Sequence, residues 1–210
     1  MMQDGGKAAF FERFPVSRET HGKLEAFADL VEEHGRTQNL VAASTMSSFW
    51  HRHVLDSAQL LQLASSGAQR WIDVGSGAGL PGLVLAILSE ASHTLVEPRR
   101  LRADFLRLAV TQLDLANRVS VIQSAIERVP AEPFDVITAR AFSSLHNTIE
   151  ATQHLAGPST DWLLHKGRNA AAEVAEARLV WEGSFTLTPS ETDPTAAVVS
   201  LRRMRRRTSP

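Results

Sequence analysis

A glycine-rich turn in the first half of the chain has the spacing of a site for a nucleotide-like ligand. Residues 71–75 read as a buried strand that ends at Gly75, and Gly77 and Gly79 follow at a spacing of two. Glycine lacks a Cβ, so such a turn can take positive φ and approach a ligand closely. Pro81 suits the first turn of a helix that begins there. A strand, a glycine turn and a helix in this order hold a nucleotide-like cofactor in α/β sheets.

Two classes of cofactor fit this turn. The series Gly77, Gly79 and Gly82 matches the dinucleotide fingerprint, but a dinucleotide site normally has its first glycine directly after the strand. Here the strand ends at Gly75. An acid two residues before that glycine, Asp73, is instead typical of the first motif of S-adenosylmethionine methyltransferases. The sequence therefore favours S-adenosylmethionine over NAD.

Glu97 is the second acid of this candidate site. It ends the next apolar run and stands 18 residues beyond Gly79. A carboxylate at this position can accept hydrogen bonds from both ribose hydroxyls in either cofactor class. A glycine turn that only connects a strand and a helix is the structural alternative, because isolated Gly-x-Gly matches are weak. The residues that the pattern assigns to cofactor binding are Asp73, Gly75, Gly77, Gly79 and Glu97.

Two cations follow other apolar runs. Arg140 comes directly after residues 134–139, and Lys166 follows residues 162–165. Ligands of open α/β sheets bind at the carboxyl ends of the strands, so both side chains are expected near the ligand. An arginine there can face a cofactor carboxylate, an RNA phosphate or the substrate base, or can form a structural ion pair. Together the two cations predict a pocket for an anionic substrate.

The remaining pattern predicts the elements that position these residues. Apolar spacing indicates helices over 17–34 and 47–63 ahead of the sheet. Strands are then predicted at 71–75, 93–97, 119–123, 134–139 and 161–165, with helices over 81–89, 99–115, 144–155 and 168–182. This alternation implies a mostly parallel sheet, and strands at 185–187 and 196–201 form an antiparallel hairpin at one edge.

The predicted fold class is α/β, a Rossmann-like S-adenosylmethionine methyltransferase fold with an N-terminal helical extension. We expect a helical extension or lid over residues 1–66 and a methyltransferase domain over residues 67–210 that ends in a basic tail. The length of 210 residues fits one domain with an appendage.

Composition excludes several classes of function. The chain has no cysteine, which excludes disulfides, thiolate metal sites and methyltransferase mechanisms that use a cysteine nucleophile. His51 and His53 lie two residues apart and would not share a helix face, so no metal is expected. A net charge of −1 argues against binding nucleic acid through bulk charge, although arginines cluster near the C-terminus. No run is long enough for a membrane helix, and we expect a cytoplasmic monomer.

Four ordered motifs give the chain a family resemblance. They are Arg52-His53-x-x-Asp56-Ser57, the glycine turn ending in Leu80-Pro81-Gly82, Arg140-Ala141-Phe142-Ser143, and Lys166-Gly167. Over roughly residues 20–200 the chain resembles the ribosomal RNA small subunit methyltransferase G family, also called glucose-inhibited division protein B. The resemblance implies N7 methylation of guanine 527 in 16S rRNA by S-adenosylmethionine. It places the family's cofactor contacts on Gly75, Leu80, Ile126, Glu127 and Arg140, whereas Leu101 and Ala125 stand where the family usually has basic residues.

Guanine N7 already presents a lone pair, so the implied reaction needs no general base. Arg140 and Lys166 are therefore predicted to act by positioning and electrostatics. The predicted RNA contacts are Arg52, His53, Arg100, Lys166, Arg202 and Arg203. For Arg52 and His53 a structural bridge between the helical extension and the sheet is an equal alternative. A methyltransferase acting on a small molecule or a protein, and a non-catalytic RNA-binding assembly factor, are the alternative functions.

Overall fold

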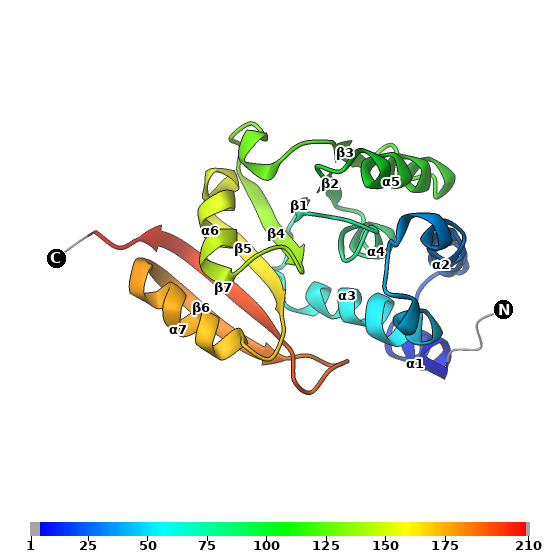
Figure 1. Ribbon diagram of the computed structural model, residues 1–210, viewed down its shortest axis with the longest axis horizontal. Helices are drawn as coiled ribbons and strands as arrows, with labels where there is room; N and C mark the ends of the chain where they lie inside the picture. The colour runs from blue at the N-terminus through cyan, green and yellow to red at the C-terminus, as the bar shows by residue number, and fades with distance from the viewer. Residues whose placement is uncertain (1–4, 209–210) are drawn as a thin grey trace.

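The computed structural model describes residues 5–208 and contains one seven-stranded sheet (Figure 1). The strand order is β3-β2-β1-β4-β5-β7-β6. The first five strands in this order run parallel, and β7 pairs antiparallel with β5 and β6. The strands are β1 (Arg70–Val74), β2 (Ser92–Val96), β3 (Val119–Ile122), β4 (Phe134–Arg140), β5 (Ala156–Lys166), β6 (Trp181–Pro189) and β7 (Ala197–Arg206). The predicted parallel sheet with an antiparallel edge hairpin is confirmed.

Helices cover both faces of this sheet. Side chains of β1 point alternately to the two faces. Ile72 and Val74 pack with α6 and α7 on one face, whereas Trp71 packs with Leu85 of α4 on the opposite face. The period of two along a strand sends successive side chains to opposite layers. The four helices that follow the strands are α4 (Gly82–Leu88), α5 (Arg100–Gln112), α6 (Leu145–Thr152) and α7 (Ala170–Val180).

A helical extension, residues 5–62, precedes the sheet. Its long helix α2 (Arg18–Gln38) begins at the predicted cap, because the Ser17 side chain accepts a hydrogen bond from the amide of Thr20. The second predicted helix, 47–63, is helical but broken into short turns of different pitch. These turns are η1 (Ala43–Ser48), the π-helical η2 (Trp50–Leu55), α3 (Asp56–Ala58) and η3 (Gln59–Gln62). A further helix at the start of the described chain, α1 (Gly5–Arg13), was not predicted.

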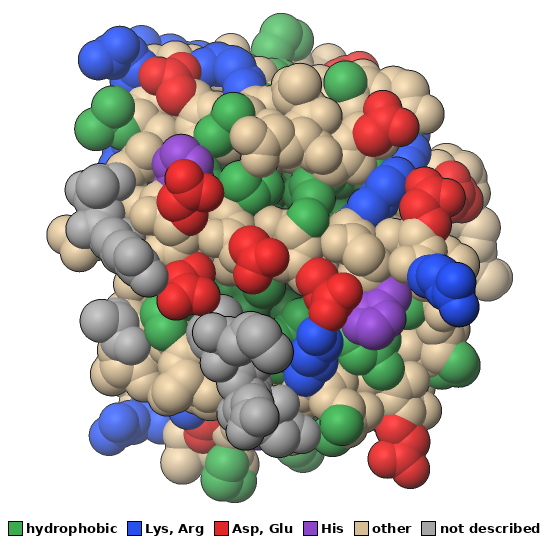
Figure 2. All heavy atoms as spheres, turned by 90° about the vertical axis from the view of Figure 1, so that its right-hand side faces the viewer, with side chains coloured by type: hydrophobic (Ala, Val, Ile, Leu, Met, Phe, Trp, Pro, Cys, Tyr) green, Lys and Arg blue, Asp and Glu red, His purple; other side chains and the backbone are tan. Residues whose placement is uncertain are grey.

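The helical extension shares its hydrophobic core with the sheet domain. Phe10 and Phe27 belong to the same buried cluster as Leu83 of α4 and Phe105 of α5. The expected boundary between residues 66 and 67 falls in the segment that joins η3 to β1. Figure 2 shows the face at the end of the molecule where α1, α2 and α5 lie, with Asp and Glu side chains across its middle and Lys and Arg scattered among them. None of the helices that the structure describes has the length and apolar character needed to cross a membrane.

Arg202, Arg203, Arg205 and Arg206 lie in a strand and not in a tail. The predicted strand ended at Leu201, but β7 continues to Arg206. Pairing with β6 gives this stretch backbone partners, and ion pairs with neighbouring acids hold several of its side chains. The expectation of a basic tail beyond Leu201 is corrected accordingly.

Candidate functional site

The parallel strands bring the predicted site residues to one edge of the sheet. Val74 pairs with Val96 of β2 and with Ala139 of β4, so the residues that follow these strands are neighbours. The amide of Gly75 donates to the carbonyl of Val96 at 2.9 Å. On the other side, Arg140 pairs with His165 of β5. The glycine turn, Glu97, Arg140 and Lys166 therefore share the edge where α/β sheets bind ligands.

The glycine turn needs its glycines. Gly75, Gly77 and Gly79 have φ of +69°, +56° and +84°, which disfavour other residues. A Cβ on Gly75 would lie 3.0 Å from the ring of Phe142, and a Cβ on Gly79 would lie 2.5 Å from Leu83. Glycine is therefore required here both by the positive φ and by the close packing of Phe142 and Leu83 against the turn.

Glu97 is fixed by two backbone amides. One carboxylate oxygen accepts from Gly77 at 2.9 Å, and the other accepts from Arg99 at 3.0 Å. The side chain is only 3% exposed. Each carboxylate oxygen has two lone pairs, so both can accept one further hydrogen bond. Glu97 thus ties the glycine turn to the end of β2 while it keeps acceptors for a pair of hydroxyls.

Asp73 lies beneath the glycine turn. One of its oxygens accepts from the Thr138 hydroxyl at 2.7 Å, and the other lies against Gly82, where an added Cβ would be 2.7 Å away. Burial raises the pKa of Asp73 to about 6, against the opposing hydrogen bonds of Thr138, Ser76 and Gly82. These contacts describe support for the first turn of α4, and the cofactor contact of Asp73 stays a prediction.

The other cofactor candidates differ in exposure: two are buried and one is exposed. Leu80 and Ile126 are 4% and 3% exposed and pack in hydrophobic clusters. Ile126 opens the turn η4 (Ile126–Arg128), whose first amides have no partner inside the turn. Glu127 is exposed and lines a cavity of about 510 Å³ together with Phe142 and Asn147. This cavity adjoins the glycine turn through Phe142.

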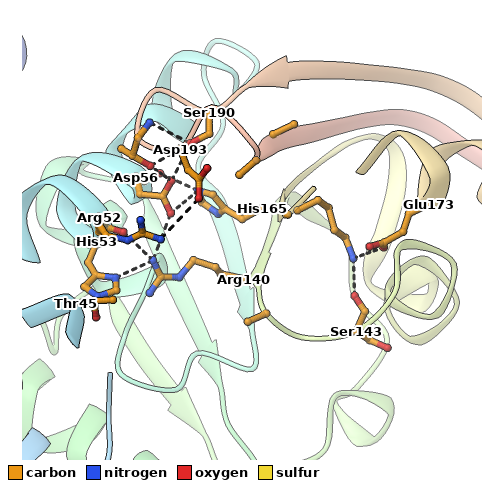
Figure 3. A pocket seen from close by; sticks show the side chains of 16 residues that line it. Thr45, Arg52, His53, Asp56, Arg140, Ser143, His165, Glu173, Ser190 and Asp193 are labelled. Atoms are coloured by element: carbon orange, nitrogen blue, oxygen red, sulfur yellow. Dashed lines mark hydrogen bonds and ion pairs between the residues drawn. The ribbon is translucent and has the colours of Figure 1, made fainter. Parts of the chain in front are cut away.

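A second cavity, of about 480 Å³, opens between the ends of β4 and β5 and the helical extension (Figure 3). We call it the β4–β5 cavity. It is lined by Thr45, Arg52, His53, Asp56, Arg140, Ala141, Ser143, His165, Lys166, Gly167, Glu173, Ser190, Thr192, Asp193, Ala196 and Ala197. Arg140 reaches across it, and its Nη1 lies 3.1 Å from Nδ1 of His53, 3.4 Å from the Asp56 carboxylate and 3.4 Å from the carbonyl of Arg52.

Asp56 joins four segments at this cavity. Its carboxylate accepts from the Thr192 hydroxyl at 2.8 Å and pairs with Arg140, while its carbonyl accepts from Nε2 of His165 at 2.8 Å. Burial alone would raise the pKa of Asp56, but His165, Arg140 and the Thr192 hydroxyl together lower it. The carboxylate is therefore charged at neutral pH.

Lys166 is held inside the wall of the β4–β5 cavity. Its Nζ lies 2.9 Å from the Glu173 carboxylate and donates to the carbonyl of Ser143. Glu173 also accepts from the amide of Leu145 at 2.6 Å. The side chain of Lys166 is 8% exposed. Lys166 thus fastens the loop after β4, and the structure brings it to the same cavity as Arg140.

The predicted RNA contacts differ in accessibility. Arg52 has a half-exposed side chain 3.8 Å from the Asp193 carboxylate. His53 is 8% exposed and faces Arg140, a contact that matches the bridging alternative. Arg100 is exposed at the start of α5, and neighbouring Leu101 is 59% exposed. The side chain of Lys166 is buried against Glu173.

The two C-terminal candidates are adjacent but unlike each other. Nε of Arg202 lies 2.7 Å from the carboxylate of Asp161, which is 1% exposed. Arg203 is exposed and has φ of +55°.

Within residues 5–208, no three His, Asp or Glu side chains are grouped so that they could hold a metal ion.

Sequence reasoning missed the partners of Arg140. Asp56 stands in a quoted motif and was expected, with Arg52 and His53, to position RNA or to brace the helical extension, but not to pair with Arg140. His165 stands beside Lys166 and had no assigned role. Thr45 and Thr192 gave no signal, because a lone threonine in a loop has no distinguishing pattern. The contact of Thr192 with Asp56 joins residues far apart in the sequence, and the contact of Thr45 with His53 depends on the local path of the helical turns, so spacing along the chain encodes neither.

Comparison with solved structures defines the class of fold. The glycopeptide N-methyltransferase MtfA, solved with S-adenosylmethionine, aligns with a TM-score of 0.62 at 10% identity over 73% of this chain and 95% of that chain. A mutant of MtNAS solved with S-adenosylmethionine aligns with a TM-score of 0.58 at 14% identity over 86% of this chain and 74% of that chain. The chain has the fold of S-adenosylmethionine-dependent methyltransferases.

Sequence comparison then gives the family. The family model GidB, rRNA small subunit methyltransferase G, matches residues 20–188. Ribosomal RNA small subunit methyltransferase G of Rhizorhabdus wittichii is 45% identical over 88% of this chain and 86% of its own length. The protein of the same name from Cereibacter sphaeroides is 42% identical over 97% and 99%. This chain belongs to the rRNA small subunit methyltransferase G family, and the resemblance seen in its motifs is confirmed.

Proposed function

We propose that this protein uses S-adenosylmethionine to methylate N7 of guanine 527 in 16S rRNA. Family membership supports the reaction class and the rRNA substrate. In the structure, the strongest support is the placement of the glycine turn with Glu97 and of the β4–β5 cavity with Arg140 at one sheet edge. A methyl donor and an acceptor base must meet at such a shared edge.

The residues present fit the methyl donor. Gly75 and Gly77 give the turn its positive φ, and the fixed carboxylate of Glu97 keeps acceptors for two ribose hydroxyls. We propose that Ile126, Glu127 and the amides at the start of η4 would hold the adenine, a role supported by the exposure of Glu127 beside the buried Ile126. When bound, S-adenosylmethionine supplies an electrophilic methyl group. Asp73 supports this turn from below.

The acceptor atom needs little from the protein. N7 of guanine carries its lone pair in the major-groove edge, so no side chain has to remove a proton before it attacks. The residues of the β4–β5 cavity act by holding the base in line with the methyl group and by binding nearby anions. Arg140 fits this role, since only Nη1 of its guanidinium has hydrogen-bond partners within the part of the chain that the structure describes.

RNA contacts follow from accessibility. Arg52, Arg100 and Arg203 have exposed or half-exposed side chains and are proposed to meet phosphates. Arg202 and Lys166 are already paired with acids, so RNA would have to compete with those ion pairs.

A transfer assay tests the function. Purified protein is incubated with tritium-labelled S-adenosylmethionine and with naked 16S rRNA, 30S subunits or bulk protein in separate reactions. We expect label in rRNA, as naked RNA or within the subunit. Label in bulk protein would indicate the alternative of a protein methyltransferase. Tight RNA binding without transfer would indicate a non-catalytic assembly factor.

The proposal also covers the cellular location and the oligomeric state of the protein. A chain that modifies rRNA works in the cytoplasm, and we propose that it acts there as a monomer. Light scattering after size-exclusion chromatography checks the monomer, and a dimer mass would contradict it.

A further inference from the structure

His53 stands between the helical extension and Arg140, with both ring nitrogens in contact with other groups. Nε2 lies 2.8 Å from the hydroxyl of Thr45, and Nδ1 lies 3.1 Å from Nη1 of Arg140. The side chain is 8% exposed, and its ring packs against Phe49 with centroids 5.4 Å apart. A buried imidazole with two such contacts has its protonation state set by its neighbours.

The hydrogen bonds fix the tautomer. The hydroxyl of Thr45 donates its one hydrogen to the carbonyl of Ala42 at 2.7 Å. It can therefore only accept from His53, which places a hydrogen on Nε2. Arg140 is a donor and cannot accept, so Nδ1 must carry a lone pair. Both contacts require the same neutral form, with Nε2 protonated and Nδ1 as an acceptor.

The surrounding charges agree with this neutral form. The groups that face the ring are Arg140 of β4 and, from the helical extension, Asp56 and Arg52; His165 of β5 faces Asp56 in turn. Burial and the charge of Arg140 lower the pKa of His53 to about 4, against the opposing effect of Asp56. At neutral pH His53 is thus no cation for a phosphate.

We propose that His53 is a positioning residue, whose neutral imidazole is oriented by Thr45 and accepts a hydrogen bond from Nη1 of Arg140. Together with Asp56 it fixes the guanidinium so that the remaining nitrogens of Arg140 are available to an anionic group in the β4–β5 cavity. This inference rests on the proposed function. It replaces a direct contact between His53 and RNA by an action through Arg140.

A double-mutant cycle separates the two roles. We expect His53→Ala to lower kcat/KM about tenfold in the native background and less than about twofold in an Arg140→Lys background, because coupled residues are not additive. Equal losses in the two backgrounds would overturn the proposal. The slope of RNA affinity against salt should be unchanged by His53→Ala, whereas a slope reduced by about one would mark a lost phosphate contact and also overturn it.

Thr45 provides a milder matched pair. Thr45→Val removes the hydroxyl but keeps the shape, and Thr45→Ser keeps the hydroxyl. We expect Thr45→Val to lower kcat several-fold with little change in the affinity for S-adenosylmethionine, and Thr45→Ser to recover most of the loss. Equal effects of the two variants would contradict a role for the hydroxyl.

Nitrogen-15 NMR determines the tautomer of His53 in the wild-type protein, so the result does not depend on whether a variant folds. The His53 ring should show a protonated Nε2 and an unprotonated Nδ1 at pH 7 and should stay neutral down to about pH 5. A protonated Nδ1 would overturn the proposal. This spectrum does not depend on rRNA methylation, so a failure of the proposed function in the transfer assay remains distinguishable.

Discussion

The glycine turn and the β4–β5 cavity meet at one sheet edge but are built differently. The turn and Glu97 come from two consecutive strand ends between residues 73 and 97, and backbone amides make most of their contacts. The β4–β5 cavity draws on residues 45–56, 140–143, 165–173 and 190–197, and side chains hold it together.

This difference has a physical consequence. A site made by a local turn depends on backbone conformation, so its weak points are glycines and the acid that anchors them. A site assembled from distant segments depends on the balance of its charges, since removing one partner leaves another buried group unpaired. Substitutions should therefore affect cofactor affinity on one side and transfer rate, together with docking of the helical extension, on the other.

The largest effect is expected on the cavity side, at Arg140. Arg140→Ala should lower the rate of methyl transfer by about 10²–10³-fold, the loss typical of removing one preorganised donor. Single-turnover transfer with saturating S-adenosylmethionine measures it. Arg140→Lys is the matched control, which keeps the charge but loses the planar fork and should be intermediate.

Folding has to be followed in the same variants. Arg140→Ala removes a partner of Asp56, so some loss of thermal stability is expected beside the loss of rate. If the rate constant per folded molecule were unchanged, Arg140 would be a structural ion-pair residue and the assignment of the cavity would fail.

Among the residues around the glycine turn, Asp73 is expected to give the largest effect, which is on the pH dependence of the unfolding free energy. Its folded pKa of about 6 lies above the ordinary 3.8, so the folded state binds more protons between these values. The unfolding free energy contributed by this group therefore falls as pH rises through that window. Asp73→Asn removes the titration, and the stability difference between variant and wild type should change by up to about 3 kcal/mol from pH 4 to pH 7.

Denaturant unfolding at a series of pH values measures this difference. It should be constant above about pH 7, where Asp73 is charged in both states. A difference that does not vary between pH 4 and pH 7 would show that the carboxyl beneath the glycine turn titrates normally.

Glu97 tests the cofactor contact itself. Glu97→Ala should weaken S-adenosylmethionine binding by about 1–3 kcal/mol, the cost of leaving buried hydrogen-bonding groups unpaired. Glu97→Gln keeps one acceptor oxygen and should lose less. Calorimetry provides the measurement, with Arg203→Ala as a variant expected to bind the cofactor normally. Tight binding of NAD, or full affinity in Glu97→Ala, would refute the assignment.

The smallest effect is expected at the far end of β7. Arg203→Ala should reduce the slope of RNA affinity against salt by about one and leave stability unchanged, because the side chain is exposed. Arg202→Ala should instead cost about 1–3 kcal/mol of stability, because Asp161 is buried. Salt titrations of RNA binding and thermal unfolding compare the neighbours, and identical behaviour would remove the distinction.

The same contrast explains what the sequence could predict. Alternating apolar runs and punctuating glycines are local signals, so the positions of the parallel strands, the glycine turn and the place of Glu97 follow from spacing alone. The edge hairpin was predicted too, but not the extension of β7 through Arg206. Arginines usually mark a solvated end, and here acids on neighbouring segments pair with them.

The β4–β5 cavity was predictable as single residues and not as a network. Arg140 and Lys166 stand out because a cation ends an apolar strand. Their partners are 84 and 7 residues away, at Asp56 and Glu173, and only the folded sheet brings them into contact. The regular helix predicted over 47–63 did not include the π-helical turn from which His53 contacts Arg140.

Mapping the product on 16S rRNA tests the central claim most directly, because it asks whether the two sites together place one methyl group on one atom. RNA methylated by the wild-type protein is treated with borohydride and aniline, which cleave at N7-methylguanine, and the modified nucleotide is identified by mass spectrometry. We predict a single new cleavage at guanine 527 that Arg140→Ala largely fails to produce. A methyl group at N1, at N2 or on a ribose oxygen would contradict the proposed chemistry.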